Sequence, residues 1–271
     1  MTDENENSKI NSTINAVTGL VEAVPIYQDA IQPAAKEIGK ALGTVAKTVN
    51  VALAPVSALV WGYDKIKDFV DNEVSEKLQN TPDANIVTPP AHVVGPALES
   101  LRYTGSVKEL RELYANLVAA SMDSRTTSNA HPSFVEIIKQ LSADEAKVLN
   151  QLQENNAHPL LTIRSNLENG SGGVDQFRYF SVLGDKAQID SNKLPIYFDN
   201  FKRLGLINIP EDYVLIGDMY KELEQHTFVQ SVLGYVESQP GRKPKMERKT
   251  LLVTSFGEQF LATCVRGHGE T

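Results

Sequence analysis

The sequence predicts a mainly α-helical protein with a small α+β part, in which N-terminal and central helices are followed by a C-terminal winged-helix-like domain. Two observations predict the helices: apolar residues recur at three- and four-residue spacing through much of residues 10–155, and two Ser-x-x-Glu patterns mark helix starts. A third observation predicts the C-terminal domain. After residue 155 the order is helix, helix, a hairpin with a basic tip and a last helix, which is the order of a winged helix.

The composition is that of a folded, acidic protein of ordinary hydrophobicity. Its 271 residues correspond to about 1.8 domains of typical size, and 41% of them are hydrophobic. The net charge of −8, from 26 Lys and Arg against 34 Asp and Glu, argues against a surface that is basic all over, but it permits a local basic patch. The single cysteine, and an acidic start in place of a basic signal-peptide region, lead us to expect a cytoplasmic protein.

The N-terminal part divides into a tail and a set of helices. Residues 1–9 are acidic and polar with almost nothing to bury, so we expect a disordered tail. Residues 10–80 show the helical spacing of apolar residues. Prolines divide this stretch into several apolar or amphipathic helices, at Pro25, Pro33 and Pro55.

Within that stretch, the 16 residues 48–63 carry no charge and are rich in valine and leucine. A membrane-spanning helix needs about 20 apolar residues, so a core helix that is hydrophobic on most faces is the leading interpretation. An interfacial or conditionally inserted hairpin and a constitutive membrane span stay open as alternatives. The candidate residues for membrane contact are Val49, Val51, Leu53, Val56, Leu59, Val60 and Trp61.

Four prolines between residues 81 and 96 predict an extended, rigid connector over residues 81–98, because such a segment cannot form a regular helix. Residues 99–155 form the predicted central helical region. Capping boxes at Ser106 and Ser142, each with a glutamate three residues later, predict the starts of two helices in this region.

Residues 156–266 are predicted to form the winged-helix-like domain, and residues 267–271 a short tail. The expected elements are a flexible loop at 169–173, helices at 190–204 and from Ser255 onward, a polar tip at 238–249, and β-like runs at 177–183, 206–209, 213–216 and 250–254. Residues 227–236 are compatible with either a strand or a helix.

The strongest candidate for nucleic-acid contact is the basic tip of this domain. Five cations against one glutamate give residues 242–249 a local charge of +4, from Arg242, Lys243, Lys245, Arg248 and Lys249. Such side chains neutralise phosphates without reading the base sequence. The preceding helix offers a companion surface with Lys193, Asn200, Lys202 and Arg203. A solvated basic loop and a protein-interaction module are the alternatives.

No motif in the sequence indicates catalysis, a cofactor or a metal site. The five histidines include no pair at i, i+4 spacing, and the sequence contains neither a phosphate-binding glycine motif nor a nucleophile elbow. Cys264 lies on the apolar side of its helix, so we expect a buried thiol. We therefore expect a protein that is not an enzyme.

Several segments resemble one family of bacterial proteins. They are Pro89-Pro90, Pro96 to Glu99, Leu110 to Leu117, His131 to Ile138, Leu141 to Ala146, Thr254 to Leu261 and Cys264-Val265. Over about residues 53–265 the chain resembles the abortive infection alpha family. The resemblance implies a bacterial origin and a role in phage defence, in which an infected cell stops growing or dies before the phage matures. The family assigns no catalytic residues to these positions. Their spacing predicts core residues at Leu110, Leu113, Leu117, Phe134, Ile137 and Leu141.

The expected function is that of a bacterial abortive-infection protein that is not an enzyme, and membrane action of its N-terminal helices is one of three mechanisms that stay open. We expect it in the cytoplasm, with association to the inner membrane through residues 48–63. The alternative is a winged-helix regulator that binds nucleic acid, or a sensor that binds a protein. A phage or host protein is the expected trigger, and the oligomeric state is open.

Overall fold

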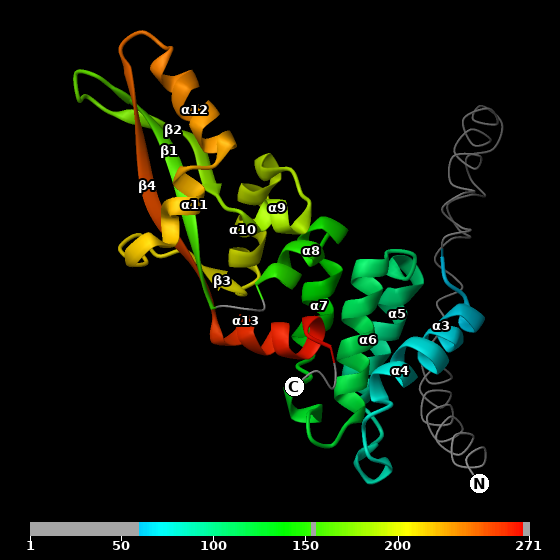
Figure 1. Cartoon of the computed structure of the whole chain (residues 1–271). Helices are drawn as coiled ribbons and strands as arrows, with labels where there is room; N and C mark the ends of the chain where they lie inside the picture. The colour runs from blue at the N-terminus through cyan, green and yellow to red at the C-terminus, as the bar shows by residue number, and fades with distance from the viewer. Residues whose placement is uncertain (1–59, 153–155, 268–271) are drawn as a thin grey trace, which may run out of the picture. The chain divides into compact units, whose positions relative to one another are not determined.

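The computed structural model describes residues 60–152 and 156–267 (Figure 1). These residues fall into two compact units: unit 1 extends to Leu141, and unit 2 extends from Ser142 to Arg266. The predicted tail at 1–9 and most of the predicted helices at 10–80 lie outside the described residues. The units divide just before the helix that Ser142 caps, whereas the sequence predicted a boundary after residue 155.

Unit 1 is helical. Its elements are α3 (Tyr63–Phe69), η1 (Val70–Val74), α4 (Ser75–Leu78), η2 (Asp83–Asn85), α5 (Ala91–Thr104), α6 (Lys108–Met122), η3 (Thr127–Asn129) and α7 (Ser133–Lys139). Helix α6 packs against η1, α4, α5 and α7, and every residue from Tyr114 to Met122 is buried. The six core positions predicted from helical spacing, from Leu110 to Leu141, are all buried.

Helix α5 begins at Ala91, inside the segment that the sequence predicted to be extended, and it contains Pro96. Pro96 lacks the amide hydrogen that would bond to the carbonyl group four residues earlier, which costs about 3 kcal/mol in a helix interior. The helix forms because it buries a row of apolar side chains that includes Val94 and Leu101, each of which contributes about 1.5–3 kcal/mol. Before α5 the connector contains η2, residues 87–90 have no regular secondary structure, and the backbone is extended at Ile86 and Pro90.

Asp123 ties the end of α6 to this connector, and its side chain is inaccessible to solvent. Arg125 forms an ion pair with it, at 2.5 Å between Nη2 and Oδ2, and the Arg125 amide donates to Oδ1 at 2.9 Å. Thr81 donates its hydroxyl to the same carboxylate at 3.4 Å, and Ile86 pairs with Asp123 through a β-bridge. Burial of this carboxylate is therefore compensated by several donors.

The two predicted capping boxes have different outcomes. At Ser142 both bonds are present: the Glu145 amide donates to the serine hydroxyl at 3.2 Å, and the Ser142 amide donates to the glutamate carboxylate at 2.7 Å. The box at Ser106 was wrong by one residue, because Val107 is the N-cap of α6 and no side chain bonds there. Arg111 instead donates to the Gly105 carbonyl at 2.9 Å and holds the turn before the helix.

Unit 2 combines a sheet with short helices. The strands are β1 (Ala157–Leu167), β2 (Gly173–Phe180), β3 (Ile207–Asn208) and β4 (Arg242–Val253). They form a four-stranded antiparallel sheet in the order β2-β1-β4-β3. The helices are α8 (Ala143–Gln151), α9 (Leu183–Ala187), η4 (Ser191–Lys193), α10 (Leu194–Arg203), η5 (Gly217–Tyr220), α11 (Lys221–Glu224), α12 (Thr227–Glu237), α13 (Ser255–Phe260) and η6 (Leu261–Val265).

Strand β1 is central, and the sequence did not predict it. It pairs with β4 along its whole length, from Ala157 opposite Leu252 to Leu167 opposite Arg242. Pro159 obscures the strand pattern, because proline removes a donor from the ladder. The structure tolerates it because β2 pairs with β1 only from Leu161 onward, so one side of Pro159 has no strand beside it.

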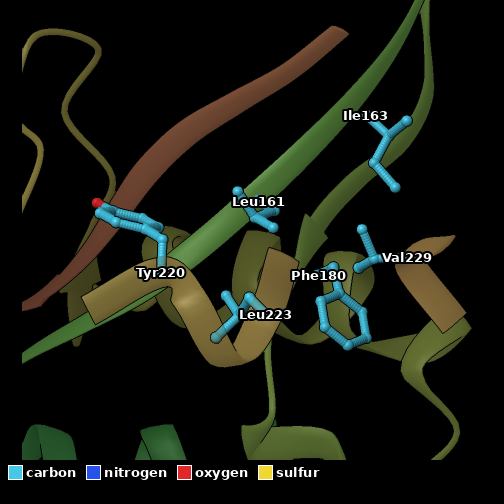
Figure 2. Close-up of a cluster of buried hydrophobic side chains, with 6 residues drawn as sticks. All are labelled: Leu161, Ile163, Phe180, Tyr220, Leu223 and Val229. Carbon is cyan, nitrogen blue, oxygen red and sulfur yellow. The ribbon is translucent and has the colours of Figure 1, made fainter. Parts of the chain in front are cut away.

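Alternation along β1 gives the sheet two different faces. Leu161 and Ile163 point to the face that α11 and α12 cover, and they form a buried cluster with Phe180, Tyr220, Leu223 and Val229 (Figure 2). Neighbouring residues Thr162 and Arg164 point to the opposite face. This cluster is the core that attaches the helices to the sheet.

Other segments of unit 2 also differ from expectation. Residues 213–216 form no strand in the structure, because the Leu215 amide bonds to the Tyr220 hydroxyl instead of a neighbouring strand. Residues 227–237 are helical, as α12, and the basic residues from Arg242 to Lys249 lie on strand β4 instead of a loop tip. Thr254, one residue before the predicted start, caps α13.

The mainly helical fold with a small antiparallel sheet confirms the predicted α+β class; the winged-helix arrangement stays a prediction.

Two helical glycines of unit 2 are expected to respond to alanine in opposite directions. At Gly257 in α13 an added Cβ would collide with the Leu206 carbonyl oxygen, so Gly257→Ala should lower the free energy of unfolding by about 1–3 kcal/mol. At Gly234 in α12 such a Cβ meets nothing within 4 Å, so Gly234→Ala should raise it by up to about 1 kcal/mol. Thermal unfolding followed by circular dichroism measures both, and shifts of the same sign would contradict this packing.

Candidate functional site

The candidate site is the solvent-exposed half of the sheet face opposite α11 and α12. Because residues that pair across antiparallel strands share a face, Arg164 lies beside Lys245 on one side and Asp175 on the other. We define the charged face as Arg164, Asp175, Lys243, Lys245, Glu247 and Lys249.

Ion pairs connect the three strands across the charged face. Arg164 Nη1 lies 2.6 Å from Asp175 Oδ1, and Lys245 Nζ lies 3.0 Å from Glu247 Oε1. Arg164 Nε is 3.8 Å from the same Glu247 oxygen, so one carboxylate offsets the repulsion between the two opposed cations. Each pair is partly exposed and contributes at most about 1 kcal/mol, so these charges can exchange partners with a ligand.

Lys249 extends the charged face toward the loop that follows β3. Its ammonium group pairs with Glu211, and this hydrogen bond raises the pKa of Lys249 and lowers the pKa of Glu211. Both groups are therefore charged at neutral pH. The pair attaches the start of the loop to β4.

A bulge in β2 brings an arginine and an aromatic ring to the same region. Tyr179 has φ of 58°, a left-handed conformation that is uncommon outside glycine, where the pairing of β2 with β1 shifts register. The Arg178 guanidinium lies 4.7 Å from the Tyr179 ring centroid, and a hydrogen bond to Tyr179 raises the Arg178 pKa. Sequence reasoning missed Arg164, Arg178 and Tyr179. The alternation from Leu161 to Arg164 could have found Arg164, whereas the bulge that places Arg178 and Tyr179 depends on the pairing of β2 with β1.

The five predicted basic residues do not form one patch, because alternation along β4 divides them between the two faces. Lys243, Lys245 and Lys249 lie on the charged face. Arg242 and Arg248 lie on the helix-covered face, where Arg248 pairs with Glu224 at 2.7 Å and stacks 5.1 Å from the Tyr220 ring centroid. Arg242 donates to the Ser165 carbonyl at 3.2 Å. Within residues 60–152 and 156–267, Lys243 is exposed and forms no salt bridge.

The companion residues on α10 and the turn before it bond mostly inside unit 2. Lys193 lies 3.1 Å from Asp144, and the Asn200 amide donates to Glu145 at 2.6 Å, so both reach the first turn of α8. Arg203 donates to Asn200 at 2.7 Å, while Lys202 is exposed. The hydrogen bond with Lys193 lowers the Asp144 pKa and raises the Lys193 pKa, and desolvation raises the pKa of neighbouring Tyr197. Lys193 and Asn200 thus join two helices.

Of the residues proposed for membrane contact, Val49, Val51, Leu53, Val56 and Leu59 lie outside the described residues. Trp61 is described and packs within unit 1. Its amide donates to the Arg102 carbonyl at 2.8 Å, and its ring lies 6.5 Å from the Phe69 ring and 5.8 Å from the Arg111 guanidinium. Val60, next to it, is half-buried. Across the residues that the structure describes, no helix combines the length and apolar character needed to cross a membrane.

Cys264 is fully buried, as the sequence predicted, and burial raises the pKa of its thiol well above the ordinary value. It is therefore a protonated core residue at neutral pH. In the part of the chain that the structure describes, no group of three or more His, Cys, Asp or Glu side chains is placed to hold a metal ion.

Fold and site together define an α+β protein, with a helical unit and a sheet unit that bears a charged, exposed face. The chain belongs to the abortive infection alpha family, whose model matches residues 62–264. A solved structure of an uncharacterised protein from the hydrocarbon-degrading marine bacterium Alcanivorax borkumensis SK2 shares 21% identity, covers 52% of this chain and 94% of that chain, and has a TM-score of 0.32. No curated protein matches the chain.

The Asp144 pair predicts a defined pH dependence of stability. The pKa of Asp144 is lower in the folded protein than the value of about 3.9 in the unfolded chain. The contribution of Asp144 to the free energy of unfolding is therefore complete above about pH 3.9, and it is lost as the pH falls through the folded pKa. We expect Asp144→Asn to destabilise the protein by less than about 1 kcal/mol at pH 7, and this difference to shrink toward pH 2.5. Urea unfolding at both pH values measures it, with the exposed Asp199→Asn as control. A difference that is the same at both pH values would contradict the pairing.

Proposed function

We propose that this chain is a phage-defence protein of the abortive-infection type, which acts by binding and by membrane contact and has no catalytic step of its own. The observation that carries the defence role is the family match over residues 62–264, which extends through both units. The proposed trigger is a phage or host protein that binds the folded part and changes the exposure of the N-terminal segment.

The membrane part of the proposal rests on the uncharged run at 48–63. Trp61 limits how far a membrane-active segment extends, because its backbone hydrogen bond to Arg102 and its ring contact with Phe69 attach the end of the run to unit 1. A membrane-active segment would therefore end before Trp61, and the apolar residues to test are Leu53 and Val56.

Expression of the full chain is expected to lower phage plating efficiency, with loss of the culture at high multiplicity of infection and protection at low multiplicity. Leu53→Asp with Val56→Asp should return plating efficiency to that of cells without the chain and abolish protection at low multiplicity, because two buried charges oppose insertion of the segment. Plating efficiency and culture survival are the two measurements.

The matched control is Asn80→Asp with Ser106→Asp, which adds the same charge at exposed positions of unit 1 outside the run and should leave plating and survival as in the native chain. Unaltered plating with the native chain, across a panel of phages, would remove the defence role. Equal protection by the native chain and the Leu53/Val56 variant would remove only the membrane part.

A second candidate is nucleic-acid binding by the charged face. The observation that favours it is the exposed Lys243, which forms no salt bridge among the described residues, on the same sheet that holds Arg178 over the Tyr179 ring. Cations beside an aromatic ring are suited to a phosphate backbone with stacked bases. The paired carboxylates Asp175 and Glu247 limit the net charge, so the expected ligand is a single strand held at few phosphates.

Charge reversal at Lys243→Glu with Lys245→Glu should weaken binding of labelled single-stranded DNA or RNA at least tenfold and flatten its salt dependence. Fluorescence anisotropy over a salt series is the measurement. Lys108→Glu with Lys186→Glu makes the same charge change at exposed lysines outside the charged face and should leave affinity nearly unchanged. Equal losses in both variants, or no binding by the native chain, would eliminate this candidate.

A further inference from the structure

The loop between β3 and α11 presents an apolar projection. Tyr213, Val214, Ile216 and Met219 are exposed by 47%, 51%, 88% and 51%, within seven consecutive residues. We define these four residues as the apolar knob. Isolated exposed apolar residues are ordinary on protein surfaces, but a contiguous group of this kind marks an interaction site.

Hydrogen bonds to Tyr220, and from Tyr220 to β4, hold the knob in a fixed position. The Leu215 amide donates to the Tyr220 hydroxyl at 3.1 Å, and this hydroxyl lies 3.0 Å from both the Lys249 carbonyl and the Thr250 hydroxyl of β4. Tyr220 is itself completely buried in the cluster between the sheet and α11 (Figure 2). Gly217, with φ of 72°, then turns the chain after Ile216. Ile216 is therefore presented on an ordered backbone, which lowers the entropy cost of binding.

Carboxylates flank the knob along the chain, and Lys221 is the one cation among residues 211–222. Asp212, Asp218 and Glu222 are exposed and form no salt bridge within the described parts of the chain. Glu211 and Glu224, next to them, are already paired with Lys249 and Arg248. An apolar centre with an acidic rim is complementary to a surface of the opposite charge pattern.

We propose that the apolar knob docks a cationic amphipathic segment of a partner protein, with apolar side chains over Ile216 and Met219 and Lys or Arg beside the acidic rim. An anionic membrane surface meets the same carboxylates with repulsion, so the charges favour a basic protein segment over lipid. This inference goes beyond the proposed function, because it depends on neither residues 48–63 nor the charged face.

The test uses the full chain and two labelled 14-residue helical peptides with identical leucine positions, one with lysine and one with glutamate at all polar positions. Fluorescence anisotropy should detect binding of the lysine peptide and at least tenfold weaker binding of the glutamate peptide. Ile216→Asp should reduce affinity for the lysine peptide at least tenfold. Ile196→Asp, a matched change at a site that is 68% exposed on α10, should leave it within twofold.

The rim has a separate readout. Asp212→Asn, Asp218→Asn and Glu222→Gln together should weaken binding of the lysine peptide and remove most of its salt dependence, without a change in thermal unfolding. The proposal is overturned if the native chain binds neither peptide, or if Ile216→Asp and Ile196→Asp have equal effects. It is also overturned if Ile216→Asp leaves peptide binding unchanged but weakens binding of the chain to phosphatidylglycerol vesicles. The same holds if peptide binding is unchanged and the substitution weakens self-association measured by light scattering.

Discussion

The long antiparallel pairing of β1 with β4 is the constraint on which the rest of unit 2 depends. Side chains alternate along a strand, and paired residues share a face, so this one register determines where each residue of both strands points. Leu161 and Ile163 form the core under α11 and α12, whereas Arg164 faces the other way. A shift of one residue would exchange the core side chains for the charged ones, which is why burial of Leu161 and Ile163 fixes the register so strongly.

The same alternation explains why a run of basic residues gives two different environments. Arg248 lies over the Tyr220 ring and beside Glu224. Its aliphatic stem contributes to packing, and its charge is paired with a carboxylate. Lys243 and Lys245, on the opposite face, reach solvent. The net charge of a sequence segment is therefore a poor guide to surface potential once the segment is a strand, because half of its side chains belong to each face.

The sequence was sufficient where the determining interaction is local. The Ser142 capping box involves residues three apart, and the predicted core positions Leu110, Leu113 and Leu117 of α6 follow from helical spacing within one segment. It was insufficient where distant partners decide: α5 accepts Pro96 because of burial against other helices, and β1 accepts Pro159 because β2 ends beside it. The charged face needed three strands to be placed together, so Arg164 and Asp175 could not be related before the pairing was known.

The loop after β3 is attached at both ends to adjacent residues of β4, and the two attachments differ in strength. At its start Glu211 pairs with the Lys249 ammonium, but the carboxylate is 76% exposed, so water and salt compete for this pair. At its end the Tyr220 hydroxyl bonds to the Lys249 carbonyl and to Thr250 inside a buried cluster, where leaving these groups unpaired costs about 1–3 kcal/mol each. The position of Ile216 therefore depends on Tyr220 far more than on the ion pair. It should persist at salt concentrations that screen the charged face.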